Sequence, residues 1–535
     1  MRNKRILVST ILTLLVLAIA LTGCSGTKNT GSGNTGTTTS ANGQGSSSEP
    51  VTLRVIAVTH SWTKDLGEIP MFNKLSEEIG VKIIWEQVRS GWDEKKNTIL
   101  ASGDVPDAFI GWGIKDSDIS TFSNVFMPLN DLIDSYAPNI TRMFKEQPDV
   151  KALATANDGN IYGLPSIIPH RPNSFNIHSI NRVWLNELGL ETPTTFDEYY
   201  NVLKAFKEQD PNKNNKQDEI PFDWAPERGL FTAMSMIGAY GNYAEDFSGD
   251  WTSAKDGKFV FLPETEDFRK LVSYLHKLYS EGLINQEVFT QDYSQFQAKS
   301  KDPEYEIVGS TMGWSLEDRF GSVYAKDYEV LLPLAAEKGI KPVWPAHPAR
   351  TKYLSNVAQI TTKNKNPEIT MKWLDGFYTE EMSAQGYYGS LGVCIEKQGD
   401  KYVVLPPQDG MGADEWKWTN ALVDAGLMYV SPELDKRIIA PESIAQRVAH
   451  DALYEPYFPK SEDILPILKF SKDDMNELSI IKTDILKMVD IKWAQWIIEG
   501  NIDAEWNSYL NQLESMGLSR MKEIYQKYYD EYLGK

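Results

Sequence analysis

The fold is decided by the stretch that begins Val51-Thr-Leu-Arg-Val-Ile-Ala-Val58, continues with Val81-Lys-Ile-Ile-Trp-Glu-Gln-Val88 and ends with Asp107-Ala-Phe-Ile-Gly111. All three segments are short and rich in apolar, β-branched or aromatic residues, a composition that predicts β-strands. The third is the shortest and contains the apolar run Ala108-Phe-Ile110, which favours a short buried strand.

Two helices are predicted between these strands. Met71–Ile79 has amphipathic spacing, and Trp92–Ala101 is followed by Gly103, a residue that commonly ends a helix. A β-α-β-α-β series predicts an open, mostly parallel sheet, which binds ligands at the carboxyl ends of its strands. We therefore expect Gly111-Trp112-Gly113, directly after the third strand, at the edge of a cleft.

The rest of the folded chain is predicted to be rich in helices. Thr195-Phe-Asp-Glu198 is a capping box, whose first and last side chains satisfy the free N–H groups of a helix start. The helix should run to about Gln209. Further elements are expected as a strand at 357–361 and helices at 265–281, 366–377, 474–500 and 503–532. Because no second polar linker occurs, the parts of this α/β chain should share several crossings.

The first 49 residues predict export. Arg2, Lys4 and Arg5 precede an apolar run at 6–21, and this run is too short to span a membrane. Leu21-Thr-Gly-Cys24 resembles the lipobox of bacterial lipoproteins, in which residues 1–23 are removed and Cys24 carries the lipid. The lipidated Cys24 and residues 25–49 form a disordered Gly/Ser/Thr linker, since this composition cannot bury enough apolar surface to fold.

Charge and cysteine content narrow the class of protein. The 535 residues carry a net charge of −20; residues 1–23 contain three basic and no acidic residues, so the mature chain would carry −23. This balance argues against nucleic acid or an anionic membrane surface as the main partner. Cys394 is the only cysteine beyond Cys24, so the exported domain must be stable without an internal disulfide.

The common catalytic motifs are missing from the sequence. It contains no GxSxG, GxxxxGK[ST], HExxH or CxxC, and its six histidines are scattered, so we expect neither a serine hydrolase nor a zinc enzyme. A secreted glycosidase stays open, because it needs only two carboxylates in a cleft. No carboxylate stands in a setting that suggests a raised pKa, which argues against that class.

One loop has the spacing of a calcium site. Oxygen-bearing side chains of Asp210, Asn212, Asn214 and Asp218 fall at positions 1, 3, 5 and 9, and the Lys216 carbonyl falls at position 7. The loop departs from an EF-hand at two positions: Asn215 replaces glycine at position 6, and Pro221 stands at position 12, so that Glu219 must supply the bidentate carboxylate. A plain polar turn is the simpler interpretation. The number of aligned oxygens favours structural calcium.

Several landmarks point to a known family. In chain order they are Ala101-Ser-Gly-Asp-Val-Pro-Asp107, Asp158-Gly-Asn-Ile-Tyr-Gly-Leu-Pro165, Leu188-Gly-Leu-Glu-Thr-Pro193 after Trp184-Leu185, and Phe206-Lys-Glu-Gln-Asp-Pro-Asn212. The chain resembles the family 1 extracellular solute-binding lipoproteins of bacterial ABC importers, within them the branch of the alginate-oligosaccharide-binding proteins. The resemblance covers about residues 51–532.

The resemblance implies a two-lobed, periplasmic-binding-protein-like fold of type II, with mostly parallel sheets and a helix-rich second lobe. The first lobe would hold residues 50–165 and about 345–400, and the second about 166–344 and 401–535. Such a protein is a monomer that closes on an oligosaccharide and presents it to a permease. In that branch the loop from Asp210 to Glu219 looks like a calcium site.

Sugar-binding residues are expected in loops, because a sugar ring needs flat aromatics against its C–H face and planar polar groups at its hydroxyls. Trp112 and Trp314 are the preferred candidates because glycines flank them or precede them. Trp85, Trp184, Trp373 and Trp493 are assigned to the core. The full set of candidates is Trp62, Arg89, Trp112, Tyr162, His170, Arg171, Trp224, Trp314 and Tyr429.

The sequence leaves the ligand open. Net charge tilts weakly against a polyuronate, although Arg89, His170 and Arg171 could receive a carboxylate. Three functions stay in play: an oligosaccharide receptor on the outer face of the membrane, which is preferred, a secreted polysaccharide-degrading enzyme or sugar sensor, and a peptide-binding receptor of similar shape.

Overall fold

The computed structural model describes residues 50–535 except 227, 245–248 and 409. The predicted signal, linker and lipidated Cys24 lie outside the described residues. Among the residues that the structure describes, no helix combines the length and the apolarity needed to cross a membrane.

The first lobe is built on the predicted parallel strands. Its five-stranded sheet has the order β2-β1-β3-β11-β4, in which β1 pairs in parallel with β2 and β3, and β11 is antiparallel to β3 and β4. The strands are β1 (Val51–Val58), β2 (Val81–Val88), β3 (Ala108–Gly111), β4 (Leu164–Ile167) and β11 (Tyr353–Ile360). The series expected from Val51 to Gly111 is confirmed.

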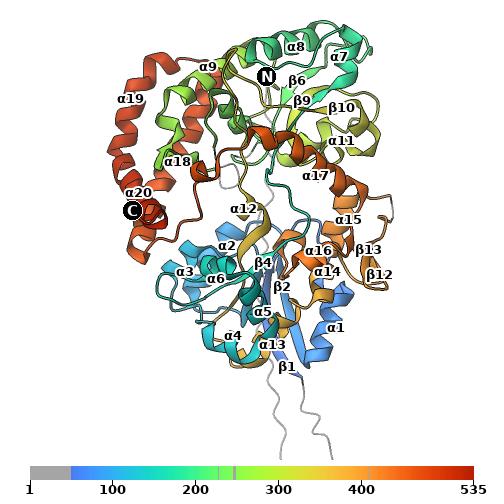
Figure 1. Cartoon of the computed structure of the whole chain (residues 1–535), viewed down its shortest axis with the longest axis vertical. Coiled ribbons are helices and arrows are strands. Elements are labelled where there is room, and N and C mark those ends of the chain that lie inside the picture. Colours follow the sequence, from blue (N-terminus) through green and yellow to red (C-terminus); the bar gives the residue numbers. More distant parts are fainter. Residues whose placement is uncertain (1–49, 227, 245–248, 409) are drawn as a thin grey trace, which may run out of the picture. The chain divides into compact units, whose positions relative to one another are not determined.

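Both faces of this sheet are buried. Leu53, Val55 and Ala57 of β1 enter one hydrophobic core, while Ile56 and Val58 enter another on the opposite face. The helices that surround the sheet (Figure 1) are α1 (Pro70–Ile79), α2 (Trp92–Ser102), α3 (Asp116–Thr121), α4 (Asn130–Tyr136), α5 (Pro138–Glu146), α6 (Pro148–Ala154), α13 (Pro367–Gly376) and α14 (Glu380–Tyr388). The predicted stop of α2 is correct, since Gly103 has φ +74°.

The second lobe has a four-stranded sheet of order β10-β5-β9-β6. Only the β6–β9 pair is parallel; β5 is antiparallel to both of its neighbours, so this sheet is mostly antiparallel, unlike the expected one. Its strands are β5 (Ile177–Asn181), β6 (Ile220–Asp223), β9 (Val308–Gly313) and β10 (Tyr328–Leu331), and a separate hairpin joins β7 (Thr252–Lys255) to β8 (Lys258–Phe261).

Helices supply most of the second lobe, as predicted. Thr195 caps α8 through the expected capping box with Glu198, and the C-terminal region is split at Gly517, whose φ is +100°. The helices are α7 (Arg182–Leu188), α8 (Phe196–Glu208), α9 (Glu266–Ser280), α10 (Tyr293–Lys299), α11 (Leu316–Tyr324), α18 (Lys472–Glu499), α19 (Ile502–Ser515) and α20 (Leu518–Tyr532). In Figure 1, α18–α20 and α9 lie on the same side of this lobe.

A small third sheet is formed by residues that follow the first-lobe helix α14 and precede the second-lobe helix α18 in the chain. It consists of β12 (Ile395–Gln398), β13 (Lys401–Val404) and β14 (Ile438–Ile439), with the helices α15 (Ala413–Asn420), α16 (Pro432–Asp435) and α17 (Glu442–Tyr454) in the same part of the chain. Leu422, Leu427 and Tyr429 join the core of the first lobe, and Tyr429 bridges Ile167 of β4. Residues 401–440 thus pack with the first lobe, whereas the sequence boundaries assigned them to the second.

Three segments of the described part of the chain cross between the lobes. The crossings are the segment between β4 and β5, the segment between β10 and β11 that contains α12 (Pro348–Lys352), and the segment that leaves β14 through α17. His347 and Asp451 from two of the crossings hydrogen-bond Asn173 of the other, at 2.9 and 2.8 Å. The expected shared crossings are therefore present.

Candidate functional site

Aromatic side chains gather where the parallel strands of the first lobe end. Val58 of β1 pairs with Val88 and Gly111, so the loops after β1 and β3 leave the sheet side by side. Gly111 has φ +96°, and a Cβ there would lie 2.0 Å from the Val58 carbonyl oxygen. Glycine is thus required for the chain to turn and present Trp112.

We define the Trp112 cluster as His60, Trp62, Trp112 and Trp418. The His60 ring lies 4.9 Å from Trp62 and 4.8 Å from Trp418, and Trp418 lies 5.3 Å from Trp112, measured between ring centroids. Trp62 and Trp112 are 51% and 42% exposed, far more than core tryptophans such as Trp373, which is fully buried. The cluster is an open aromatic surface, and two of its members were predicted.

The loop that carries Trp62 is held by polar contacts from β2 and the residue after it. Arg89 donates from Nε to the Thr63 carbonyl at 2.6 Å and from Nη2 to Asp65 at 2.7 Å. Gln87 donates to the Thr63 and Lys64 carbonyls. Arg89 was predicted as a ligand contact; in the structure it supports the loop instead of standing free.

A second group surrounds Trp314, which follows β9 directly. The guanidinium carbons of Arg171 and Arg447 lie 4.9 and 4.7 Å from the centre of its ring. Arg171 comes from the crossing after β4 and Arg447 from α17, so the half-buried Trp314 meets both crossings. This predicted tryptophan and the predicted Arg171 are brought together.

Charged side chains extend this group into the Trp314 network, which we define as Arg171, Lys301, Trp314, Asp318, Asp414, Lys417, Asp424, Arg447 and Asp451. Arg171 pairs with Asp424 at 2.5 Å and Lys417 with Asp414 at 2.8 Å. Arg447 lies 4.0 Å from Asp451. Both arginines that contact the Trp314 ring thus lie near a carboxylate, Arg171 near Asp424 and Arg447 near Asp451.

The carboxylates of this network titrate differently. Burial and the neighbouring Asp414 carboxylate raise the pKa of Asp318 to about 6. For Asp414 the Lys417 ammonium outweighs burial, so the pKa is lowered. Elsewhere, burial raises the pKa of Glu306 to about 7. The expectation that no carboxylate would have a raised pKa is wrong, because the burial of these groups comes from tertiary packing.

Four other predicted ligand residues make their recorded contacts with residues outside these two groups. Trp224 is 2% exposed in the core of the second lobe, and Tyr429 is 1% exposed in that of the first, where its hydroxyl donates to Glu146. Tyr162 donates to Asp158 at 2.7 Å within its own turn, and His170 lies 3.3 Å from Asp435. All four are engaged within the protein.

Four residues of these two groups were not selected as candidates from the sequence, namely Asp414, Trp418, Asp424 and Arg447. Trp418 and Trp416 stand two residues apart on α15, and the structure buries Trp416 to 9% exposed while leaving Trp418 half-buried. Two tryptophans at that spacing face different sides of a helix, which was the available signal. The acids and Arg447 carry no comparable pattern.

The loop from Asp210 to Glu219 adopts the predicted turn. Asn215 has φ +59°, the left-handed value expected where the family pattern has glycine, and Asp210 accepts from the Asn214 and Asn215 backbone N–H groups. The Asn214 amide donates to Asp218 at 2.9 Å. Within the described part of the chain, no three His, Cys, Asp or Glu side chains gather closely enough to hold a metal ion.

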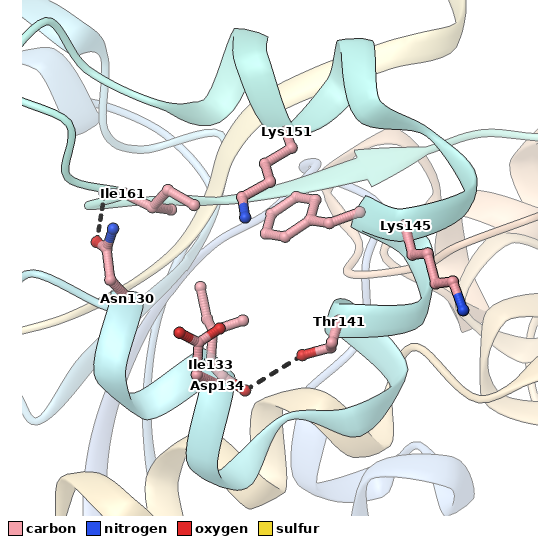
Figure 2. A pocket seen from close by; sticks show the side chains of 8 residues that line it. Asn130, Ile133, Asp134, Thr141, Lys145, Lys151 and Ile161 are labelled. Carbon is pink, nitrogen blue, oxygen red and sulfur yellow. Dashed lines mark hydrogen bonds between the residues drawn. The ribbon is translucent and has the colours of Figure 1, made fainter.

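A separate pocket of about 230 Å³ lies on the first lobe (Figure 2), lined by residues of α4, α5 and α6 with Ile161. Ile133 and Phe144 supply apolar walls, and Lys151 points into the space. The pocket shares no residue with the Trp112 cluster or the Trp314 network.

The two lobes, their crossings and the aromatic groups define a solute-binding protein. No family model matches the chain. It is 33% identical over 488 residues to the fructooligosaccharide ABC transporter substrate-binding protein FusA of Streptococcus pneumoniae, covering 88% of each chain. The structure of FusA in complex with kestose superposes with a TM-score of 0.83 at 31% identity, over 90% of this chain and 99% of FusA.

Two Bacillus subtilis proteins are also similar. The polygalacturonan/rhamnogalacturonan-binding protein YtcQ is 27% identical over 73% of this chain and 74% of YtcQ. The lipoprotein LipO is 28% identical over 47% of this chain and 48% of LipO. An EF-hand mutant of FusA in complex with fructo-nystose also superposes with a TM-score of 0.83, at 30% identity over 90% and 99% of the two chains. The chain belongs to the family of extracellular, oligosaccharide-type substrate-binding proteins of ABC transporters.

Proposed function

We propose that this protein captures an oligosaccharide between its two lobes and delivers it to the permease of an ABC importer. The observation that carries the proposal is the Trp112 cluster, an exposed aromatic surface at the carboxyl edge of the first-lobe sheet. Its Trp418 sits on α15 together with Asp414 and Lys417 of the Trp314 network. An aromatic ring, a planar carboxylate and an ammonium thus stand on one short helix, which supplies both the stacking and the hydrogen-bonding groups that sugar binding uses.

Closure of the lobes would bring the two groups onto one ligand. Trp112 and Trp62 belong to the first lobe, whereas Trp314 and Asp318 follow β9 of the second. A ligand that touches both favours the closed state by its contacts there, and the permease would recognise that state. Trp224, Tyr429 and Tyr162 are left out of this proposal because the protein itself engages them.

The chain would act at the outer face of the membrane. Its predicted lipobox places the lipid on Cys24, and a flexible linker of residues 25–49 would let a monomer open, close and dock. The relative LipO is named a lipoprotein, which supports this placement. Replacing Cys24 by serine should shift the protein from the membrane fraction to the medium; retention of that variant on the membrane would contradict lipid anchoring.

Structural calcium belongs to the same proposal. Glu219 has a buried Oε1 that receives no hydrogen bond from the described residues, and burial together with Asp218 and Asp210 raises its pKa. A calcium ion would bind the unpartnered Oε1 of Glu219 and would offset the repulsion between the three carboxylates. The oxygen ligands of this loop therefore fit a calcium ion. Asp210, Asn212, Asn214, Asp218, Glu219 and the Lys216 carbonyl would hold the ion, which would fix the loop before β6.

The calcium site can be tested by titration. Calorimetry should show that chelator-treated protein binds one calcium ion, and calcium should raise the melting temperature. Asp218→Ala should lower the calcium affinity at least tenfold and make the rise in melting temperature smaller. Glu187→Ala is a suitable control, because Glu187 pairs with Lys213 of the same loop at 2.7 Å without being a predicted ligand. Equal calcium affinity in Asp218→Ala and the parent protein would contradict the proposed calcium site.

One observation favours a second candidate, a glycosidase. Asp318 and Asp414 combine a raised and a lowered pKa, the division of roles that a pair of catalytic carboxylates needs. Burial and the Lys417 ion pair account for both shifts without catalysis, and the relatives are named as binding proteins. We therefore propose binding without turnover.

Incubation with oligosaccharides of defined length separates the candidates. A receptor is thermally stabilised and leaves the sugar intact, whereas a glycosidase creates new reducing ends. Stabilisation by peptides but by no sugar would instead favour a peptide receptor.

A further inference from the structure

The end of α15 meets the loop after β1 at the Trp112 cluster. This helix carries Trp418 and ends at Asn420, and the next residue, Ala421, is extended with φ −146°. The helix therefore ends without the left-handed glycine that commonly closes a helix. Its last carbonyl groups need donors from another segment or from water.

The loop that carries Trp62 supplies two of these donors. The Thr63 hydroxyl donates to the Trp418 carbonyl at 3.0 Å, and the Lys64 backbone N–H donates to the Thr419 carbonyl at 3.2 Å. Thr63 and Trp418 are 355 residues apart in the chain. The loop thus caps a helix from a distant part of the sequence.

Asn420 completes the junction between the loop and the helix. Its amide nitrogen donates to the Trp416 carbonyl at 2.9 Å, and its amide oxygen accepts from the Lys64 ammonium at 2.6 Å. These partners fix the orientation of the amide, because a carbonyl only accepts and an ammonium only donates. The ammonium also lies at the carboxyl end of the helix, where the helix dipole favours a cation. Asn420 is 3% exposed, so its side chain is held on all sides.

The junction bears directly on the arrangement of the aromatic rings. Thr63 follows Trp62 in the chain, and its hydroxyl binds the carbonyl of Trp418 itself. The His60 ring contacts both tryptophans, and its Nδ1 accepts from the Trp62 backbone N–H at 3.2 Å. Trp112 meets Trp418 from the loop after β3. Without the junction, the end of α15 and its tryptophan could shift relative to the other rings.

The geometry points to Thr63, Lys64 and Asn420 as positioning residues of the sugar site. None of the three belongs to the Trp112 cluster, yet together they hold Trp418 against its other rings. Rings that are ordered before the ligand arrives lose less conformational entropy on binding and therefore bind more tightly. This inference rests on the proposed function, because it assigns these residues a role in the aromatic surface that would bind the sugar.

Thr63→Val tests the inference with little change of shape, since it removes the hydroxyl and keeps the branched side chain. The readout is the circular dichroism of the ligand-free mature chain. The contribution of the Trp112–Trp418 pair, whose centroids lie 5.3 Å apart, is the signal that Trp418→Phe removes. Thr63→Val should lose most of this signal, whereas Thr63→Ser, which keeps the hydroxyl, should retain it.

A second pair of variants and a control complete the experiment. Lys64 is only half-buried, so Lys64→Met stays informative should Thr63→Val fold poorly, and Lys64→Arg keeps a donor for Asn420. Thr483→Val is the matched control, because the exposed Thr483 hydroxyl donates to the Ser479 carbonyl at 2.7 Å on α18. A full ring signal in Thr63→Val and Lys64→Met would overturn the inference.

Calorimetry with kestose, the sugar in the FusA structure, measures the effect on binding. Thr63→Val and Lys64→Met should each lower the kestose affinity about fivefold, and the Ser and Arg variants should restore it. Full kestose affinity in both weakened variants would also overturn the inference. If the parent protein binds no kestose, that result counts against the proposed ligand class, and the dichroism of the ligand-free protein still decides on the positioning residues.

Discussion

The Trp112 cluster and the Trp314 network differ in almost every physical respect. The first is an exposed aromatic surface on loops that leave two neighbouring parallel strands. The second is a half-buried tryptophan set among paired charges that come from two crossings, α15 and the start of α11. An aromatic surface gains affinity from contact area with little regard to the pattern of hydroxyls, whereas fixed polar groups discriminate between ligands. In the proposed receptor, the first region would supply affinity and the second would supply selectivity.

The largest effect should come from breaking a charge pair of the network. Asp424→Ala leaves the buried Arg171 without its counter-ion, and such losses cost about 3 kcal/mol of unfolding free energy. Asp104→Ala removes an exposed partner of Arg54 and should cost less than about 0.5 kcal/mol. Urea unfolding of both variants measures the difference. A loss below about 1 kcal/mol for Asp424→Ala would mean that the pair is not a structural part of the site.

A smaller effect, on binding alone, is expected in the aromatic cluster. Trp112→Ala and Trp62→Ala should each lower the affinity for the cognate sugar about tenfold, since one stacking contact contributes about 1.5 kcal/mol. Both side chains are substantially exposed, so the unfolding free energy should stay almost unchanged. Tyr532→Ala, 66% exposed near the end of α20, is the control. Full affinity in the Trp112 and Trp62 variants would assign sugar binding to the Trp314 network alone.

The smallest expected effect is on how the free energy of unfolding depends on pH. The pKa of Asp318 is about 6 in the folded protein and ordinarily 3.8, so between these values the folded state keeps a proton that the unfolded state releases. Stability should therefore fall as pH rises from about 4 to about 6 and level off above. Because Asp318 is partly exposed, we expect about 1 kcal/mol.

Asp318→Asn removes this proton and should flatten that part of the profile, with a gain in stability at pH 7. Urea unfolding at a series of pH values compares it with the parent protein, and the aromatic cluster serves as reference because Trp112→Ala should leave the slope as it is. An unchanged slope in Asp318→Asn would assign the titration to another carboxylate.

Local sequence patterns predicted the strands and helices from Val51 to Gly111 of the first lobe almost to the residue. The strand 81–88 and the helix around 92–102 coincide with β2 and α2, because alternating or helical spacing and a terminal glycine act within a few residues. The strand direction in the second lobe was missed, since β5 pairs with β9 and β10 from more than a hundred residues away. Packing of residues 401–440 with the first lobe was missed for the same reason.

The sequence by itself determined the strand ends from which Trp62 and Trp112 emerge, the turn from Asp210 to Glu219 and the core positions of Trp184 and Trp373. Only the tertiary structure decided that Trp418 joins Trp112, that Trp224 and Tyr429 are buried, and that Arg171 is already paired with Asp424. The physical reason is the distance along the chain over which each interaction acts. Periodicity and turn chemistry act between close neighbours in the chain, whereas burial and charge pairing depend on which distant segments meet.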